Sequence, residues 1–432
     1  MRLYVRDCAK IESADIVIDG ITVIAGANNT GKSTVGKILF SFFNAMNGID
    51  DKILQERKRV ICSECLRHIT DFLRTEEFED YTARRRESIR IVIRRKVYDL
   101  PKEELTEENI VEIVEEILSP FVSDQIRSNL GYEEMLGNCW SAVKSLLDIP
   151  EEVLSKEVLS RYFNGEFNGQ INSLHKKGTE SKIGVEIKGK KIEFCFVENE
   201  CSAFETQLSI MNKAIYIDNP FVLDSLNNYV ELNSRDTFLR KLLLADSKRD
   251  VMDGIIESVM AKEKLDEIKD VLGNVVSGKI TKDSTGEYYF EEESIHAPVA
   301  FGNLSTGVKA FVLLKMLLEK GILKNKDVLI LDEPEIHLHP EWQVAYAEVL
   351  VLIQKYFDLS VVIATHSPYF VDAINLFSIR YETDKKVNYY LSELDENGVR
   401  MDCVTDDIER IYQKMASPIQ VLDTLRYELN NR

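Results

Sequence analysis

The chain has 432 residues, with 54 Lys and Arg against 73 Asp and Glu, and a formal net charge of −19 at pH 7. The length suffices for two or three domains of about 150 residues each, whereas the acidic balance excludes a surface that is basic overall, so nucleic-acid binding would require a local basic patch. Seven scattered cysteines, no secretory signal pattern and no apolar run of membrane-spanning length predict a reduced, cytoplasmic protein without a membrane segment of its own.

The first residues predict three short strands and then a helix. Apolar residues alternate or run together between polar turns, which is the pattern of strands. The helix runs to about residue 44, before the stop signal Asn47-Gly48. The three strands are expected at residues 2–6, 14–18 and 21–25.

A long segment after residue 50 has the periodicity of helices. From residue 51 to about 162, apolar residues recur three and four positions apart among many charged ones. Residues 88–98 alternate isoleucine with arginine or valine, so strand and helix stay open there. We expect two parts of one head at 1–48 and 176–432, and a helical insertion at 49–175 that provides dimer or partner contacts.

The remainder of the chain returns to strands and helices, which alternate regularly from residue 306 onward. This alternation predicts an α/β fold with a sheet flanked by helices on its faces. In chain order we expect strands at 183–187, 191–197 and 213–217, helical spacing from 220 to 272, strands at 275–281 and 287–290, and then helix 306–318, strand 328–331, helix 341–356, strand 359–364 and helix 368–374.

A glycine-rich stretch, Gly26-Ala27-Asn28-Asn29-Thr30-Gly31-Lys32-Ser33-Thr34, separates the third strand from the first helix. This pattern predicts a phosphate-binding loop: backbone N–H groups and the helix N-terminus face the phosphates, the lysine reaches the β and γ phosphates, and the serine binds Mg²⁺. The alternative is a glycine-containing turn that matches by chance. The residues assigned to the nucleotide here are Gly26, Asn28, Asn29, Thr30, Gly31, Lys32, Ser33 and Thr34.

A second motif follows the apolar run Val328-Leu329-Ile330-Leu331, where Asp332 and Glu333 are adjacent carboxylates. A strand that is buried on both faces is continuously apolar, and ligands bind at the carboxyl ends of strands in open α/β sheets. We therefore expect Asp332 to hold Mg²⁺ together with Ser33, and Glu333 to orient or deprotonate the attacking water. The alternative is an acidic turn after a core strand.

Two further motifs begin helices. In Leu304-Ser305-Thr306-Gly307-Val308-Lys309, Ser305 is suited to cap a helix, or the free N–H groups of that helix, around Ser305 and Gly307, face a γ-phosphate. In Ala364-Thr365-His366-Ser367-Pro368, His366 either has a structural role or contacts the γ-phosphate.

In this order the four motifs resemble the head of an ABC-type ATPase. The phosphate loop together with Asp332-Glu333-Pro334-Glu335-Ile336-His337-Leu338-His339-Pro340 resembles the SMC/RecF-like branch, and most of all the overcoming-lysogenization-defect (OLD) type ATPases of bacterial anti-phage systems. The resemblance covers about residues 1–48 and 180–375. It implies an ABC-type P-loop head, ATP and Mg²⁺ as ligands, and slow, dimer-dependent ATP hydrolysis.

The resemblance also implies a homodimer formed through the heads, and a higher oligomer is the alternative. Two heads of this family enclose two nucleotides, so Ser305 and Gly307 of one subunit would reach the phosphate held by Lys32 of the other. His337 and His339 would then be interface residues and not metal ligands.

Several family features are unassigned or missing. The glutamine that completes Mg²⁺ coordination is either Gln207 or is replaced near Asp218-Asn219-Pro220. Residues 377–432 lack the clustered acidic motifs of a TOPRIM nuclease domain, and the long separation between Ser33 and Ser305 argues against a transporter subunit. The candidates for the adenine-stacking residue are Tyr4, Arg6 and Lys10.

Two weaker signals lie in the predicted insertion. The basic run from Arg84 to Lys96 is either a solvated face that pairs with nearby acidic stretches or a site for DNA, RNA or another acidic partner. Cys62, Cys65 and His68 share one helical face, and the alternatives are a zinc site or a reduced cysteine pair.

We therefore predict an ATP-gated head dimer that acts as a sensor or scaffold in an anti-phage system of the Septu-like or PARIS-like kind. Without an effector domain of its own, it would control a separate nuclease or toxin. The alternative is an SMC/RecF-like DNA-repair ATPase that binds nucleic acid directly. The two differ in whether nucleic acid stimulates ATP turnover.

Overall fold

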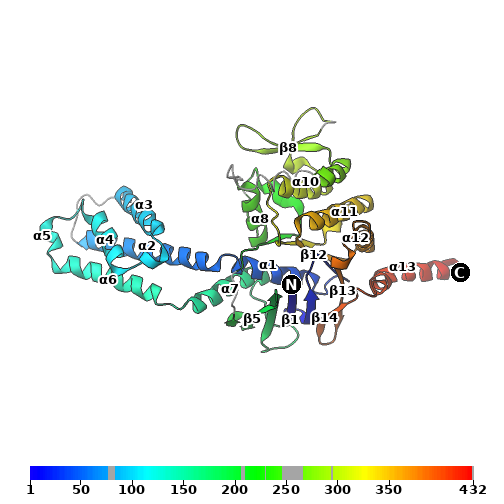
Figure 1. Cartoon of the computed structure of the whole chain (residues 1–432), viewed down its shortest axis with the longest axis horizontal. Helices are drawn as coiled ribbons and strands as arrows, with labels where there is room; N and C mark the ends of the chain where they lie inside the picture. Colours follow the sequence, from blue (N-terminus) through cyan, green and yellow to red (C-terminus); the bar gives the residue numbers. More distant parts are fainter. Residues whose placement is uncertain (76–82, 206–209, 229, 246–265, 293–294, 431–432) are drawn as a thin grey trace. The chain divides into compact units, whose positions relative to one another are not determined.

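The computed structural model describes residues 1–75, 83–205, 210–228, 230–245, 266–292 and 295–430 (Figure 1). These residues form two compact units, one made of Met1–Asn47 with Leu159–Arg432 and the other of Gly48–Val158. Within the described ranges, no helix is both long enough and apolar enough to cross a membrane.

The first unit is built on a mixed sheet, which has 11 strands in the described part of the chain. The strands are β1 (Arg2–Cys8), β2 (Ile11–Val17), β3 (Ile21–Gly26), β4 (Ser181–Ile187), β5 (Lys190–Val197), β6 (Glu200–Glu205), β7 (Ala214–Ile217), β11 (Val328–Asp332), β12 (Ser360–Thr365), β13 (Val387–Asp395) and β14 (Gly398–Cys403). Their order is β6-β5-β4-β1-β2-β14-β13-β3-β12-β11-β7. The last five strands in this order are parallel, whereas β1, β4, β5 and β6 pair antiparallel.

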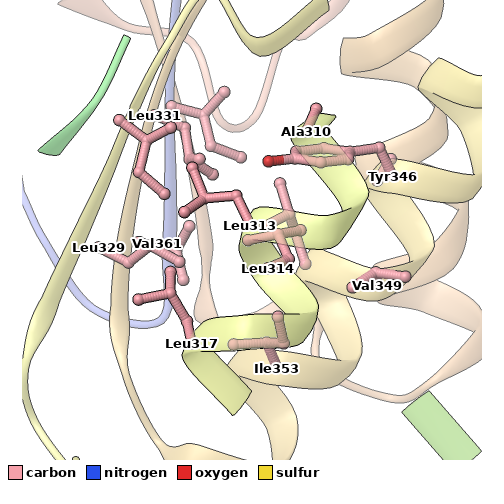
Figure 2. Close-up of a cluster of buried hydrophobic side chains, with 14 of the residues drawn as sticks. Ala310, Leu313, Leu314, Leu317, Leu329, Leu331, Tyr346, Val349, Ile353 and Val361 are labelled. Carbon is pink, nitrogen blue, oxygen red and sulfur yellow. The ribbon is translucent and has the colours of Figure 1, made fainter. Parts of the chain in front are cut away.

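Helices cover the parallel part of the sheet on both faces. On one face, Leu329 and Leu331 of β11 point toward the buried leucines of α10 (Thr306–Glu319), which α11 (Pro340–Phe357) covers in turn (Figure 2). On the other face, Ile330 meets α1 (Lys32–Met46), where a Cβ on Gly36 would lie 2.8 Å from its side chain. Burial on both faces accounts for the continuously apolar sequence of β11.

Smaller elements of the first unit surround this sheet. They include a second sheet made of β8, β9 and β10, and a helix over residues 266–275. Their bounds are η2 (Pro220–Ser225), α8 (Ser234–Leu244), β8 (Gly278–Lys282), β9 (Tyr288–Glu292), β10 (Val299–Ala300), η3 (Phe301–Asn303), η4 (Pro334–His337), α12 (Pro368–Arg380), η5 (Asp384–Lys386) and α13 (Glu409–Asn430).

The second unit is helical and has its own apolar core. In α3, Ile89, Ile93 and Val97 are four residues apart and buried, whereas Ile91 is 61% exposed, so the stretch that sequence pattern leaves open is a helix. The elements are α2 (Ile49–Thr75), α3 (Ala83–Asp99), η1 (Lys102–Glu104), α4 (Glu107–Leu118), α5 (Asp124–Arg127), α6 (Leu130–Leu147) and the first half of α7 (Glu151–Phe167).

The predicted α/β class with a mixed sheet is confirmed, and the differences lie in the start of β2 and in three strands that the sequence pattern does not predict. β2 begins at Ile11, inside a predicted polar turn, because Cys8 pairs with Ile11 across the turn at Ala9 and Lys10. The sequence pattern also predicts neither β6 nor the strand pair β13 and β14. Of the helical stretch expected at 220–272, residues 246–265 lie outside the described residues.

Candidate functional site

The parallel strands bring the predicted motifs to one edge of the sheet. Asp332 pairs with Ala364, Thr365 with Ala25, and Gly26 with Ser392, so β11, β12, β3 and β13 end side by side. The phosphate loop, the acidic turn and the histidine turn follow these strand ends. The carboxyl edge of a parallel sheet is where ligands bind in open α/β folds.

The phosphate loop depends on glycine at its first position. A Cβ on Gly26 would lie 2.6 Å from the carbonyl oxygen of Ser392, and the Ser392 hydroxyl donates a hydrogen bond to the carbonyl of Thr30. Gly31 has a φ of 72° and precedes α1 without a capping side chain. The first N–H groups of α1 therefore lack a side-chain cap, which suits an anion.

Lys32 is buried inside this loop. Its Nζ donates to the carbonyl oxygens of Gly26 at 3.1 Å and Ala27 at 2.8 Å, and lies 3.8 Å from Glu333 Oε1. Burial lowers the pKa of Lys32, and the carboxylates of Glu333 and Asp332 oppose that shift. The structure thus holds the ammonium group at the centre of the loop.

The other loop residues assigned to the nucleotide lie around this ammonium group. Asn28 and Asn29 are exposed, and Asn29 accepts a hydrogen bond from Lys10. The Thr30 hydroxyl closes the loop on the carbonyl of Ala27 at 2.8 Å. Thr34 lies in the first turn of α1, and its N–H donates a hydrogen bond to the carbonyl oxygen of Gly31 at 3.0 Å.

Asp332 lies between two hydroxyl groups. Ser33 Oγ donates to Asp332 Oδ1 at 2.9 Å, and the Tyr216 hydroxyl donates to Oδ2 at 2.7 Å. Burial raises the pKa of Asp332, while these two hydrogen bonds favour the ionised form. The adjacent serine and carboxylate oxygens are ligands of the kind that Mg²⁺ takes, so these two side chains would hold the ion.

Sequence reasoning missed the residues that support Asp332 from behind. The guanidinium of Arg235 lies 4.5 Å from the centre of the Tyr216 ring and pairs with Glu166 and Asp218 at 3.0 Å each. In the sequence, the apolar stretch Ala214–Ile217 directly before Asp218 is the feature that indicates a strand ending near the site. Because Asp218 is engaged here, the Mg²⁺-completing position stays open, and Gln207 lies outside the described residues.

Glu333 and His366 face each other. Glu333 Oε1 lies 3.6 Å from His366 Nδ1. Glu333 adopts a left-handed conformation with a φ of 50°, which is uncommon for a residue other than glycine. The structure therefore brings both predicted catalytic side chains to the same edge as Lys32.

A third acidic residue, Glu335, ties the acidic turn to the histidine turn. Its Oε1 accepts hydrogen bonds from the Thr365 hydroxyl at 2.6 Å and from the backbone N–H groups of His366 at 2.7 Å and Ser367 at 3.2 Å. Its Oε2 is buried and has no partner among the described residues. Sequence reasoning assigned no role to this carboxylate.

Ser305 and Gly307 lie at the start of α10 and, within the described residues, form no hydrogen bond or ion pair with the phosphate loop of the same chain. Ser305 is exposed and caps the helix by accepting from the Val308 N–H at 3.4 Å. Gly307 is buried, and a Cβ there would lie 2.8 Å from the Trp342 ring. Gly307 thus has a packing reason to be glycine.

The candidates for the adenine-stacking residue contact side chains close to them. The Tyr4 ring lies 5.2 Å from both Arg2 and Lys191, and Arg6 lies 3.8 Å from Asp7. Among the described residues, no group of three His, Cys, Asp or Glu side chains is placed to hold a metal ion. Cys62 and Cys65 of α2 therefore belong to no such group. The Sγ atom of Cys65 instead contacts the Sγ atom of Cys139 at 3.3 Å.

The sequence comparison with a known family covers the start of α10, the acidic turn and the histidine turn, but not the phosphate loop. Residues 204–372 match the model of a family described as "AAA domain, putative AbiEii toxin, Type IV TA system". Elongation factor 3B of Saccharomyces cerevisiae is 32% identical over 127 residues, and elongation factor 3 of Candida glabrata is 34% identical over 134 residues. Each match covers 29% of this chain, but only 11% and 12% of the respective elongation factor.

The similar solved structures cover most of this chain, but their TM-scores are low. The SMC head bound to the C-winged helix domain of ScpA has a TM-score of 0.44 at 10% identity and covers 93% of this chain and 97% of that chain. The SMC head domain from Thermotoga maritima has a TM-score of 0.37 at 11% identity, with 93% and 98% covered. The family match and the phosphate loop together indicate a P-loop ATPase domain.

Replacing Glu335 by alanine should destabilise the head by roughly 2–4 kcal/mol, because it leaves three donors of the histidine turn without their buried acceptor. Glu335→Gln keeps one acceptor oxygen and should lose less than half of that free energy. Urea unfolding measures both effects. Glu341→Ala removes an exposed carboxylate from α11 and is the control; equal losses for Glu335→Ala and Glu341→Ala would contradict the assignment.

Removing the Tyr216 hydroxyl should weaken Mg²⁺ binding. Hydrogen bonds to a ligating carboxylate orient it, and their loss typically lowers metal affinity by roughly 10–100-fold. Tyr216→Phe should therefore raise the Mg²⁺ concentration needed for half-maximal ATP hydrolysis by about that factor. Tyr390→Phe, which removes a hydroxyl bonded to the Val17 N–H at 2.7 Å, is the control and should leave the Mg²⁺ dependence unchanged.

Proposed function

We propose that the chain binds and slowly hydrolyses ATP with Mg²⁺, and that this reaction controls its assembly with other proteins. The observation that carries the proposal is the convergence of Lys32, Ser33, Asp332 and Glu333 at one sheet edge. No acidic side chain lies in the first turn of α1, so the helix N-terminus is suited to phosphates.

Each side chain has a distinct role in this reaction. Lys32 holds the β and γ phosphates, and Ser33 and Asp332 hold the metal ion. Bound Mg²⁺ neutralises charge on the phosphate oxygens. Glu333 accepts a proton from the attacking water. His366 lies close enough to Glu333 to orient its carboxylate, and its contact with the γ-phosphate is part of the proposal.

The site is completed by a second copy of the chain in this proposal. Ser305 is exposed at the N-terminus of α10, where it is free to face a phosphate bound to another subunit. A symmetric head dimer would place each Ser305 opposite the partner's phosphate loop. Gly307 lets α10 approach Trp342 and positions this helix start indirectly.

Two inactive variants test the dimer when they are mixed. Lys32→Ala removes the phosphate ligand, and Ser305→Arg places a large side chain at the exposed start of α10, with loss of the helix cap on the Val308 N–H. Heterodimers of the two should contain one intact site, so an equal mixture should regain about a quarter of the unaltered turnover if the sites act independently. Each variant alone is the control, and no recovery on mixing would contradict a shared site.

A third variant tests the role of Glu333 in hydrolysis. Glu333→Gln should retain ATP binding and slow hydrolysis by roughly 10²–10⁴-fold, because a general base contributes about that factor. Light scattering should then show a stable dimer with ATP. Hydrolysis at the unaltered rate would show that Glu333 is not the base.

We further propose that the head dimer controls a separate nuclease or toxin in anti-phage defence, with the second unit as the docking element. The support is the family match, whose description includes a toxin of a toxin–antitoxin system. The second candidate is an SMC/RecF-like ATPase that binds nucleic acid directly, and the basic side chains of α3 favour it.

An effector should be encoded nearby. The product of an adjacent gene should co-purify with this chain, and the pair should lower phage plating efficiency. Lys32→Ala should abolish this protection while both proteins remain expressed, because the head can no longer respond to ATP. A chain that purifies alone and leaves phage plating unchanged would contradict the effector proposal without affecting the ATPase proposal.

A further inference from the structure

The second unit contains a cavity of about 720 Å³ between α2 and α3 that is rich in arginine. Arg86, Arg90 and Arg94 of α3 line it, with Tyr98 one turn further and Arg59 opposite on α2. Residues four apart share one side of a helix and lie about 6 Å apart along its axis. The three arginines of α3 therefore form a regular row of positive charge.

The charges in this row are only partly compensated. Arg59 pairs with Glu56 at 2.6 Å, and Arg90 lies 3.6 Å from Glu87. Among the described residues, neither Arg86 nor Arg94 forms an ion pair, and the Arg94 guanidinium lies 5.4 Å from the centre of the Tyr98 ring, which leaves the other face of that ring for a base. An anion in the cavity would relieve the repulsion among these guanidinium groups.

A half-buried thiol in the cavity adds no negative charge. Burial raises the pKa of Cys62 to about 11, so this thiol remains protonated at neutral pH. Glu87 is thus the one ionised acid among the described residues that line the cavity.

The cavity is built on rigid elements. Ile89, Ile93 and Val97 are buried in the core of the second unit and fix the rotation of α3, which turns the arginine row away from that core. Lys58 of α2 donates to the carbonyl oxygens of Tyr98 and Leu100 and holds the end of α3. The row is therefore preorganised by packing and not by the ligand.

The chemistry of the lining selects the ligand. Guanidinium groups bind phosphate oxygens in bidentate fashion. Tyr98 adds an aromatic ring at the end of the row, and a positive groove with an aromatic side chain is the arrangement that binds single strands. A cavity of this size lies within the usual range for small ligands of roughly 300–1,000 Å³, so it admits individual nucleotides.

We propose that this cavity binds a single-stranded nucleic acid through consecutive phosphates held by Arg86, Arg90 and Arg94. Tyr98 stacks on a base at one end of the bound segment. Of the predicted basic run, the side chains of Arg84 and Arg85 lie outside the described residues, and Arg95 does not line the cavity. The binding site is thus one face of α3 and not the whole run.

Fluorescence anisotropy of labelled 20-nucleotide DNA and RNA strands, measured over a series of salt concentrations with the full chain, tests this proposal. Arg90→Gln with Arg94→Gln should weaken binding about tenfold or more. It should also reduce the slope of log K against log salt by roughly 1.4, at about 0.7 for each lost phosphate contact. Arg95→Gln with Arg127→Gln removes the same charge from exposed positions outside the cavity and should keep both values.

A variant that binds the strand more tightly provides a further test, because misfolding would weaken binding and not strengthen it. Glu87→Gln removes the carboxylate that lines the cavity and releases Arg90, so it should tighten binding several-fold. An excess of unlabelled duplex or inorganic polyphosphate should compete at least tenfold more weakly than the unlabelled strand. Lys32→Ala should bind the strand normally, because the cavity does not depend on the ATP site.

Three results would overturn the proposal. The first is no binding by the unaltered chain at low salt. The second is equal loss in the cavity variant and in the control variant. The third is displacement by polyphosphate or duplex as effective as by the single strand, which would assign the cavity to phosphate in general or to another form of nucleic acid.

Discussion

The parallel pairing of β11, β12, β3 and β13 is the constraint on which the head depends. It places the end of β3 beside the ends of three strands that follow more than 300 residues later in the chain. Ser33 can reach Asp332, and Glu335 can reach the histidine turn, only while this register holds. A shift by one residue would turn each apolar strand side chain to the other face and separate these pairs.

Burial of charge is the energetic consequence of this arrangement. Lys32 and Glu335 are buried and Asp332 is partly buried, and an isolated charge in the protein interior is strongly unfavourable. Two loop carbonyls therefore accept from Lys32, two hydroxyls donate to Asp332, and three donors of the histidine turn hold Glu335. Glu335 Oε2 has no partner among the described residues, so one buried polar atom remains unsatisfied at the junction between the acidic turn and the histidine turn.

The sequence predicts the motifs well because each motif is local. A glycine loop between strand and helix, and a pair of carboxylates after an apolar run, are patterns that need no knowledge of distant residues. Their supporting residues are different: Tyr216, Arg235 and Ser392 act through strands and helices that meet only in the folded chain. No local pattern links these side chains to Asp332 or to the loop.

The missed strand β13 has the same explanation. The stretch Val387-Asn388-Tyr389-Tyr390-Leu391 is rich in residues that favour strands, yet its place beside β3 depends on long-range pairing. The helix α3 shows the converse, because its alternating isoleucines resemble a strand until the core of the second unit shows which of them are buried. In both cases, contacts between residues far apart in the chain determine which secondary structure forms.

The chain carries a net charge of −19, but the local charge has opposite sign at the sheet edge of the first unit and in the cavity of the second unit. In the head, one buried lysine is surrounded by Asp332, Glu333 and Glu335, so a polyphosphate entering this edge meets more negative than positive charge. A divalent cation would offset that excess, so nucleotide binding at this proposed site should depend on Mg²⁺. Among the described residues that line the cavity beside α3, the arginines outnumber the one carboxylate, Glu87, so a phosphate in the proposed site there would need no metal ion. The net charge of the chain therefore predicts neither local balance of charge, and the arrangement of charges within each unit distinguishes the two proposed sites.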